Sequence, residues 1–431
     1  MFDTELIKFN KLRLSSIIIF PLCLIMINSY TTLMRYNVLF RAIYLIGILL
    51  FTIIACKQLT FKTIEQVLWF SFLIYVTVTA LVLNNKDANA FLISLWSFST
   101  LLIVAFDAVF YERLIGIFNI IIFIFVLSMY VNMIIPNLMT GPLNFLLLDA
   151  SKGTIAKEVS AGVYSGLFAE KLAAAYGASL GFVFAYSQYL KKSNIKYLIL
   201  SLFYIMAIFL TGKRTAVLIP VAVMIISIIV NKRDSKIFKR AGKYLILLLV
   251  LFIIGVLFIP QVQGMLDKLF TTMFSDTSDD VTSHRASLLW PMAQDMFKEH
   301  PIIGNGLCSY NSYVNSLGVF DNSVISSWIS NAHNIFLQLL AETGIIGGVL
   351  IFSLFLFLLV HTFMLYRRIT DPDHKQLCLI SLGMQCVFLL VGSTENSFYA
   401  TGELLTYFVA FGIYIALERK YRIIKLGKVN V

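Results

Sequence analysis

The chain has 431 residues, of which 59% are hydrophobic and 13% are charged. Soluble domains carry about 25% charged residues, so this composition excludes an ordinary soluble protein and predicts an integral membrane protein. The formal net charge of +11 does not indicate nucleic-acid binding, because excess Lys and Arg in membrane proteins collect in cytoplasmic loops. The five cysteines are scattered and odd in number, which predicts packing residues rather than a disulfide framework or a metal site.

Apolar runs recur along the whole chain, and a helix needs about 20 residues to cross a bilayer. These runs predict an all-α polytopic membrane protein with about twelve transmembrane helices. The segment Met1–Arg13 carries mixed charge and no small-residue cleavage site follows it, so we interpret the first run as a span rather than a signal peptide. The predicted crossings cover residues 14–29, 37–56, 66–84, 89–106, 114–135, 170–190, 195–211, 215–231, 244–260, 344–366, 376–394 and 401–417.

Most of the 34 Lys and Arg residues fall in alternate connections, which lie inside if the N-terminus lies inside. Because basic residues accumulate on the cytoplasmic side, this bias predicts that both termini are cytoplasmic. The predicted regions are a transmembrane bundle of nine spans over 1–260, an extracytoplasmic loop subdomain over 261–343, and three spans with a cytoplasmic tail over 344–431.

The outer loop over 261–343 is too long for a simple connection, and loops of this length are usually functional or disordered. Part of it has the apolar spacing of an amphipathic helix, which Pro291 starts or kinks and Pro301 ends. A shorter outer segment covers about 136–169. The apolar positions of the predicted loop helix are Leu288, Leu289, Met292, Met296 and Phe297.

Basic side chains in the outer segments are candidates for chemistry. Lys213 and Arg214 occupy a tight outer turn, where their charge opposes the topology signal. They fit either a functional site or anchors whose side chains snorkel to headgroups. Arg285 opens the amphipathic stretch after an acidic run, and it fits either a functional residue or a surface ion pair.

His333 lies where the polar loop re-enters an apolar helix. We predict a helix that starts after a cap at Ser330 and Asn331, carries His333 and runs toward Gly344. On its own, His333 also fits a helix-start histidine that is hydrogen-bonded to a nearby carbonyl. Leu337 stands four residues later, so the spacing of a helical zinc site is missing.

The segment from His333 to Gly347 has the pattern His-Asn-x9-Gly-x-x-Gly. This pattern resembles the signature of the O-antigen ligase and polysaccharide polymerase superfamily. Arg214, in a Lys-Arg-Thr-Ala turn ahead of a span, resembles the Ser/Thr-Arg-Thr-Ala element of that family. Arg285 with Trp290, followed by His-Pro-Ile-Ile-Gly-Asn-Gly over 300–306, resembles the run in its large outer loop.

A fourth element, Gly166–Lys171, is similar to a Gly-x-Phe-x-x-Lys-Asn element of the family, but only loosely. Leu172 stands where the family has Asn, so we assign this element no site role. The motifs cover roughly residues 160–395, and the rest of the chain matches by hydropathy.

The resemblance implies transfer of a glycan from an undecaprenyl-pyrophosphate carrier to an acceptor hydroxyl outside the bacterial cytoplasmic (inner) membrane. In this reading Arg214, Arg285 and Lys213 bind the pyrophosphate, because guanidinium groups pair bidentately with phosphate oxygens. His333 is the general base of a direct, inverting displacement, since neutral histidine accepts protons at physiological pH. Asn334 supports His333 by a hydrogen bond or caps the helix. The family is described as metal-independent, and we expect no metal and no cofactor.

The motifs do not separate a polymerase, which extends a lipid-linked O-antigen, capsule or exopolysaccharide, from a ligase, which moves a finished glycan to lipid A core of lipopolysaccharide or to another acceptor. We favour the polymerase. A non-enzymatic transporter or flippase is the alternative from another class, but the unequal halves and the single long outer loop oppose it. Expected partners are the lipid-linked glycan and membrane lipid but no nucleic acid, and binding of a chain-length regulator stays open.

Overall fold

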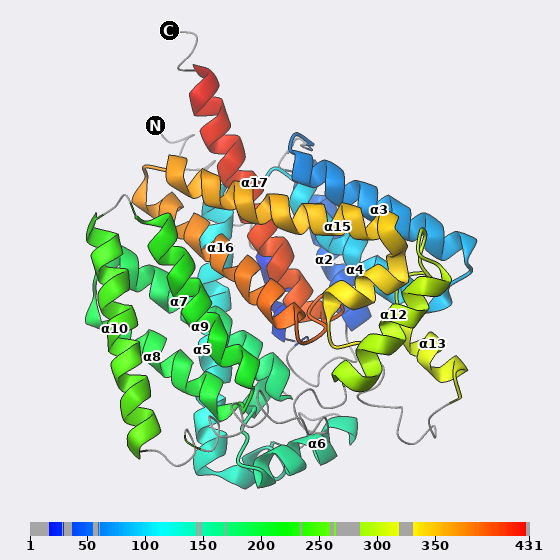
Figure 1. Cartoon of the computed structure of the whole chain (residues 1–431). Coiled ribbons are helices and arrows are strands. Elements are labelled where there is room, and N and C mark those ends of the chain that lie inside the picture. The colour runs from blue at the N-terminus through cyan, green and yellow to red at the C-terminus, as the bar shows by residue number, and fades with distance from the viewer. Residues whose placement is uncertain are drawn as a thin grey trace.

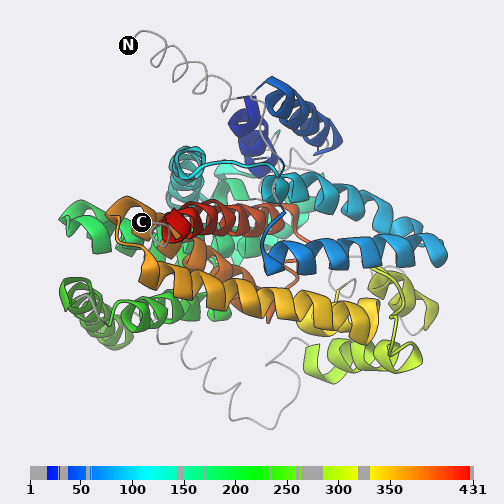
Figure 2. The ribbon, with the colours of Figure 1, turned by 90° about the horizontal axis from the view of Figure 1, so that it is seen from above.

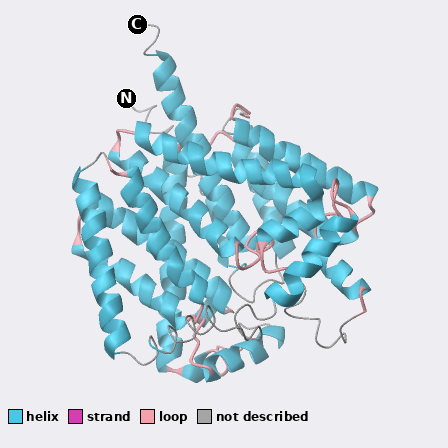
Figure 3. Cartoon of the chain, in the orientation of Figure 1, coloured by secondary structure: helices cyan, strands magenta, loops and turns pink. Residues whose placement is uncertain are grey.

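The computed structural model is a bundle of helices (Figure 1). It describes residues 17–27, 29, 37–54, 59, 61–143, 145, 149–168, 170–232, 235–258, 263, 285–318 and 331–427. In these ranges the backbone forms helices and connecting turns, with one isolated bridge between Leu59 and Val104 (Figure 3). The all-α prediction is therefore confirmed.

The longer helices of the bundle are α2 (Asn37–Ile54), α3 (Ile64–Val82), α4 (Asn89–Ile103), α5 (Ala108–Ile134), α7 (Lys171–Lys192), α8 (Ile195–Leu210), α9 (Arg214–Val230), α10 (Ser235–Phe258), α15 (Ile335–Arg368), α16 (Pro372–Gly392) and α17 (Thr401–Gly427). The shorter elements are η2 (Lys86–Ala88), η3 (Pro136–Leu138), α6 (Asp149–Ser160), η5 (Gly166–Phe168), η6 (Arg285–Leu289), α12 (Trp290–Glu299) and α13 (Tyr310–Ser316).

Each predicted crossing overlaps a described helix. Five of these helices, α3, α5, α15, α16 and α17, are long and apolar enough to span a bilayer. Shorter apolar helices cover Ile17–Ile27, Leu39–Leu49, Ile195–Leu210 and Thr215–Val230. The multi-pass character is supported on this basis, whereas the number of twelve crossings and their orientation stay predictions.

The helices α16 and α17 form the centre of the bundle. Most of their residues are buried, whereas fewer than half of those in α3, α5 and α15 are. Figure 2 shows α17, in red, running between the other helices, and it packs against α4, α5, α15 and α16. Many large apolar side chains of the outer helices are exposed, such as Leu81, Val82 and Ile134. In a membrane protein, lipid tails cover such apolar surfaces.

The helix α15 has a sharp kink at Gly344, whose backbone is left-handed with φ of 64°. The helix predicted from His333 toward Gly344 and the span predicted over 344–366 are therefore two parts of one kinked helix, α15. The position of His333 in a helix was wrong: α15 begins at Ile335, and Asn334 is its N-cap. An Asn side chain competes well for the first free backbone amides, which explains why the helix begins after it.

The kink of α15 receives the loop that follows α12. The amides of Ile345 and Ile346 donate to the carbonyls of Pro301 and Ile302, at 2.9 and 3.2 Å. Gly304 and Gly344 approach so closely that a Cβ on Gly344 would lie 2.6 Å from the amide nitrogen of Gly304. The two glycine-containing motifs therefore fold against each other and fix α12 on α15.

Gly344→Ala is expected to lower the free energy of unfolding by about 1–3 kcal/mol, because alanine is strained at positive φ and its Cβ would lie 2.4 Å from the carbonyl oxygen of Ile302. Thermal unfolding in detergent measures this effect. Gly242→Ala in α10 is the matched control, since a Cβ there meets no heavy atom within 4 Å. Equal stability of the two variants would contradict the predicted role of the kink.

The predicted amphipathic loop helix is confirmed as η6, a π-helix, followed by α12, with Pro291 in the first turn of α12. Its apolar face packs on the first part of α15 in a small separate core. This packing places Arg285, at the start of η6, beside the segment that carries His333. The buried members of the core are Leu289, Ala293, Met296, Tyr310, Val314, Ala332 and Ala341.

Candidate functional site

Three of the predicted site residues come from three separate connections. Lys213 lies between α8 and α9, and Arg285 is the first residue of η6. His333 lies two residues before Ile335, where α15 begins. Arg214 is the first residue of α9, but its side chain lies outside the described part of the structure. The site is therefore built here without that guanidinium.

The side chains of Lys213, Arg285 and His333 converge on one carboxylate, that of Glu395. Lys213 Nζ lies 2.5 Å and Arg285 Nη2 3.0 Å from Glu395 Oε1. His333 Nδ1 lies 2.8 Å from Glu395 Oε2. Arg285 Nη1 also donates to the carbonyl of Thr394 at 2.6 Å, so its fork holds two neighbouring residues of one loop. The residues that the motifs selected are thus brought together.

The Glu395 side chain is 5% exposed, whereas the three side chains around it are about one-fifth exposed, between 18% and 21%. Burial alone would raise the pKa of Glu395, but the hydrogen bond from His333 and the charges of Lys213 and Arg285 outweigh it. The pKa of Glu395 is therefore held well below its usual range. The carboxylate is an ionised, largely buried anchor for Lys213, Arg285 and His333.

The contact with Glu395 also selects a tautomer of His333. A carboxylate only accepts hydrogen bonds, so His333 Nδ1 carries a proton. In the neutral ring the proton acceptor is then Nε2. His333 has a positive φ of 49°, a region in which His is more common than most residues.

The side-chain amide of Gln338 forms hydrogen bonds with the residue before His333 and the residue after Glu395. Its Oε1 accepts from the backbone amide of Ala332 at 3.0 Å and from Asn396 Nδ2 at 2.7 Å. Gln338 is 2% exposed, so these bonds face little competition from water. The two loops that carry the acid and the base are therefore fixed to one side chain of α15.

Asn334 acts as the cap of α15. Its Oδ1 accepts from the amides of Phe336 and Leu337 at 3.0 and 3.2 Å. Of the two roles predicted for Asn334, capping is the one that the structure describes. The cap sets where α15 begins and so fixes His333 one residue before it.

The element Gly166–Lys171, to which the sequence analysis assigned no site role, lies closer to the site than expected. Glu170 is the N-cap residue of α7, and its carboxylate interacts electrostatically with Lys213, Glu395 and His333. A hydrogen bond of 3.3 Å between the hydroxyls of Thr394 and Thr215 joins the Glu395 loop to the start of α9.

Sequence reasoning missed Glu395. It stands in the connection between α16 and α17, far from the motifs, in the run Ser-Thr-Glu-Asn-Ser. One signal was present: a single acidic residue lies in the short connection between two apolar helices, which the topology prediction places outside, and a charge at membrane depth indicates function. Within the described residues, no three His, Cys, Asp or Glu side chains group so that they could hold a metal ion.

A family model described as O-antigen ligase matches residues 198–352 of the chain. This segment is therefore similar to the O-antigen ligase family. The O-antigen ligase segment contains Lys213, Arg214, Arg285 and His333, whereas Glu395 lies beyond it. No curated protein matches the chain.

The match over residues 198–352 supports, in general terms, a function of the O-antigen ligase or polymerase type, with glycosyltransferase-like activity on a lipid-linked glycan in a membrane. The match does not distinguish ligase from polymerase. The predicted resemblance to the superfamily is confirmed, and the roles of individual residues stay predictions.

Proposed function

We propose that the protein polymerises undecaprenyl-pyrophosphate-linked oligosaccharide repeat units at the extracytoplasmic face of the bacterial cytoplasmic membrane. The observation that carries this proposal is the convergence of Lys213, Arg285 and His333 on Glu395, with all three converging residues inside the O-antigen ligase segment. The site combines two cationic groups for a pyrophosphate with a histidine for a hydroxyl proton.

The proposed reaction is a single displacement with inversion. The acceptor hydroxyl attacks the anomeric carbon of the donor glycan, the bond from that carbon to the phosphate oxygen breaks, and the pyrophosphate carrier leaves. His333 Nε2 takes the hydroxyl proton as the new glycosidic bond forms. Charge develops on the leaving oxygen, and preorganised cations stabilise it most strongly in a site with little water.

Arg285 and Lys213 would stabilise this leaving group, with Arg214 as the third expected cation. The guanidinium of Arg285 is held by Thr394 and Glu395 in a fixed orientation, so little of its conformational entropy is lost when phosphate binds. Glu395 keeps the cationic groups close together before the donor arrives. The pyrophosphate of the donor would then contact Lys213 and Arg285 while both keep their ion pairs with Glu395.

The lipid-linked glycans of the native host test this function. Their size profile is compared with the gene deleted, restored, or carrying His333→Ala, at matched protein levels. Accumulation of a single lipid-linked repeat in the deletion and in His333→Ala is the expected result for a polymerase. His374→Ala is the control, because His374 lies in the first turn of α16, at the end of that helix away from Glu395.

A ligase is the alternative, in which the finished glycan passes to lipid A core or another acceptor. Long lipid-linked polymer that stays unattached in the deletion would establish the ligase and exclude the polymerase. A profile unchanged by the deletion would overturn both and favour a non-enzymatic transporter or flippase.

A further inference from the structure

A second polar recess lies at the opposite end of the helices that carry the site. Lys213 precedes α9 and Asn231 follows it, while Lys375 lies in the first turn of α16 and Glu395 follows its end. The 17 residues of α9 and the 21 of α16 correspond to helices of about 25 and 30 Å at 1.5 Å per residue. This separation matches the thickness of the hydrocarbon core, so the two sites belong to opposite membrane surfaces.

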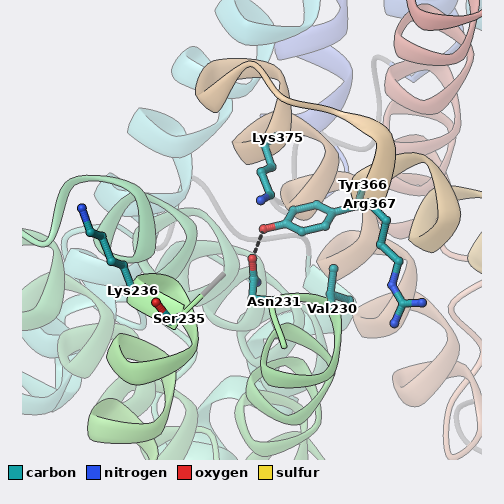
Figure 4. A pocket seen from close by; sticks show the side chains of 7 residues that line it. All are labelled: Val230, Asn231, Ser235, Lys236, Tyr366, Arg367 and Lys375. Atoms are coloured by element: carbon teal, nitrogen blue, oxygen red, sulfur yellow. Dashed lines mark hydrogen bonds between the residues drawn. The ribbon is translucent and has the colours of Figure 1, made fainter. Parts of the chain in front are cut away.

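The recess has a volume of about 440 Å³ (Figure 4). We call it the basic recess. It lies where the connection between α9 and α10 meets the connection between α15 and α16. Its described lining residues are Val230, Asn231, Ser235, Lys236, Tyr366, Arg367 and Lys375.

Three cationic side chains line the basic recess, each from a different helix. Lys236 is in the first turn of α10, Arg367 in the last turn of α15, and Lys375 in the first turn of α16. None of its seven described lining residues is acidic. The described start of α10 carries no acidic residue in its first turn, so its positive dipole end adds to the field.

The nearby acids of α16 are already engaged. Asp371 Oδ1 accepts from the amides of Asp373 and His374 at 3.0 and 2.9 Å as the cap of α16. Asp373 forms an ion pair with Lys191. Asp371 and Asp373 therefore bond the start of α16 and Lys191, respectively.

The floor of the basic recess is polar and rigid. The Tyr366 hydroxyl donates to Asn231 Oδ1, and Asn231 Nδ2 donates to the carbonyl of Ser227 at 2.8 Å. Asn231 and Tyr366 are 1% and 2% exposed. The Lys375 ammonium lies 5.2 Å from the centre of the Tyr366 ring, within cation–π range. Figure 4 shows the Lys375 and Asn231 side chains meeting at the Tyr366 hydroxyl.

We propose that the basic recess binds the phosphate of an anionic phospholipid headgroup. The Lys375 ammonium lies at the polar floor, whereas Lys236 and Arg367 line the margin with their charged ends extending outward (Figure 4). The Arg367 guanidinium lies 4.3 Å from the centre of the Phe363 ring, and an Arg at this margin offers two parallel donors to phosphate oxygens. The place of the recess, at the ends of the spanning helices α15 and α16, is the level at which headgroups lie. Basic pockets between transmembrane helices bind anionic headgroups in this way.

A ligand in the basic recess ties the connection after α9 to the connection before α16. Both helices end at the candidate functional site on their other side, so the bound headgroup fixes the frame that carries Lys213 and Glu395. Because the ligand binds the folded protein, it raises the unfolding temperature, and the rise grows with the logarithm of ligand concentration above the Kd.

Thermal unfolding of the full chain in a zwitterionic detergent tests the proposal, with titration of short-chain phosphatidylglycerol, short-chain phosphatidylcholine or inorganic phosphate. Phosphatidylglycerol is expected to raise the unfolding temperature and phosphatidylcholine is not. The triple variant Lys236→Gln, Arg367→Gln, Lys375→Gln is expected to need at least about tenfold more phosphatidylglycerol for the same rise in unfolding temperature, because charge-assisted hydrogen bonds to the phosphate are lost.

The control triple variant is Lys192→Gln, Lys196→Gln, Lys239→Gln, which removes the same charge from exposed positions outside the lining of the basic recess. It is expected to respond as the wild type does. Native mass spectrometry of retained lipid gives a second measurement if the first triple variant is less stable. A shift with inorganic phosphate that the first triple variant abolishes supports the same phosphate site with a free anion as its source. Equal titrations of the two triple variants, or no shift with either anion, would overturn the proposal.

Discussion

Glu395→Gln is expected to lower kcat for glycan transfer by about 10²–10⁴-fold, with a smaller effect on donor binding. An amide in place of the carboxylate can donate to His333 Nδ1, which moves the ring proton to Nε2 and removes the proton acceptor. The change also leaves Lys213 and Arg285 without their common negative charge. Turnover of a purified lipid-linked donor by the variant and the wild type measures the effect.

Mild acidification is not expected to change the charge of Glu395. Its pKa is held well below the usual range in the folded protein, so the stabilisation by its ion pairs is present above the unfolded pKa and is lost only as pH falls through the lower folded value. Glu395 is therefore ionised throughout the range from about pH 5 to 8. Loss of kcat on acidification within this range is therefore not expected to come from Glu395.

The matched variant Glu395→Asp keeps the charge but shortens the side chain, and it is expected to retain more activity than Glu395→Gln. The double variant with His333→Ala is expected to be little worse than His333→Ala alone, since residues that act as a unit are not additive. Multiplicative losses in the double variant would show that Glu395 acts independently of His333.

The sequence was sufficient for the parts of the site that depend on local pattern. Lys213, Arg285 and His333 each stand in a short motif, and each is brought into the same cluster by the fold. Hydropathy placed a helix at every predicted crossing, because a long apolar run has few other stable structures in lipid. These signals are local and strong.

The remaining features depend on contacts distant in sequence. Glu395 receives its partners from positions 62, 110 and 182 residues away, so no window of the sequence could reveal it. His333 is predicted inside a helix because Ser330 and Asn331 are taken as the cap. In the structure Asn334 is the cap and His333 has a positive φ, so the helix begins after both. The kink at Gly344 was read as a boundary because glycine permits many conformations, and only the packing of the loop at Gly304 selects one.

Glu342→Ala is expected to lower the free energy of unfolding by about 3–5 kcal/mol, the largest stability effect predicted here. The Glu342 side chain is fully buried, and its carboxylate accepts four hydrogen bonds. The donors are the amides of Cys308 and Tyr310 at 2.7 and 3.2 Å, Gln338 Nε2 at 2.9 Å, and the Tyr399 hydroxyl at 2.5 Å. Alanine leaves all four donors buried without this acceptor.

The same change is expected to act on the site. Glu342 joins the loop before α13 and the connection between α16 and α17 to α15. It also accepts from Gln338 Nε2, and Gln338 Oε1 accepts hydrogen bonds from the residues next to His333 and Glu395. Hydrogen exchange of the segment 300–318 should therefore rise in Glu342→Ala together with the fall in thermal stability. Glu299→Ala is the control, because Glu299 is exposed and bonds one hydroxyl, that of Tyr313, so its change should lie within about 0.5 kcal/mol. If exchange over 300–318 stayed at the wild-type level in Glu342→Ala, the loop would be held by the Gly304 and Gly344 contact alone.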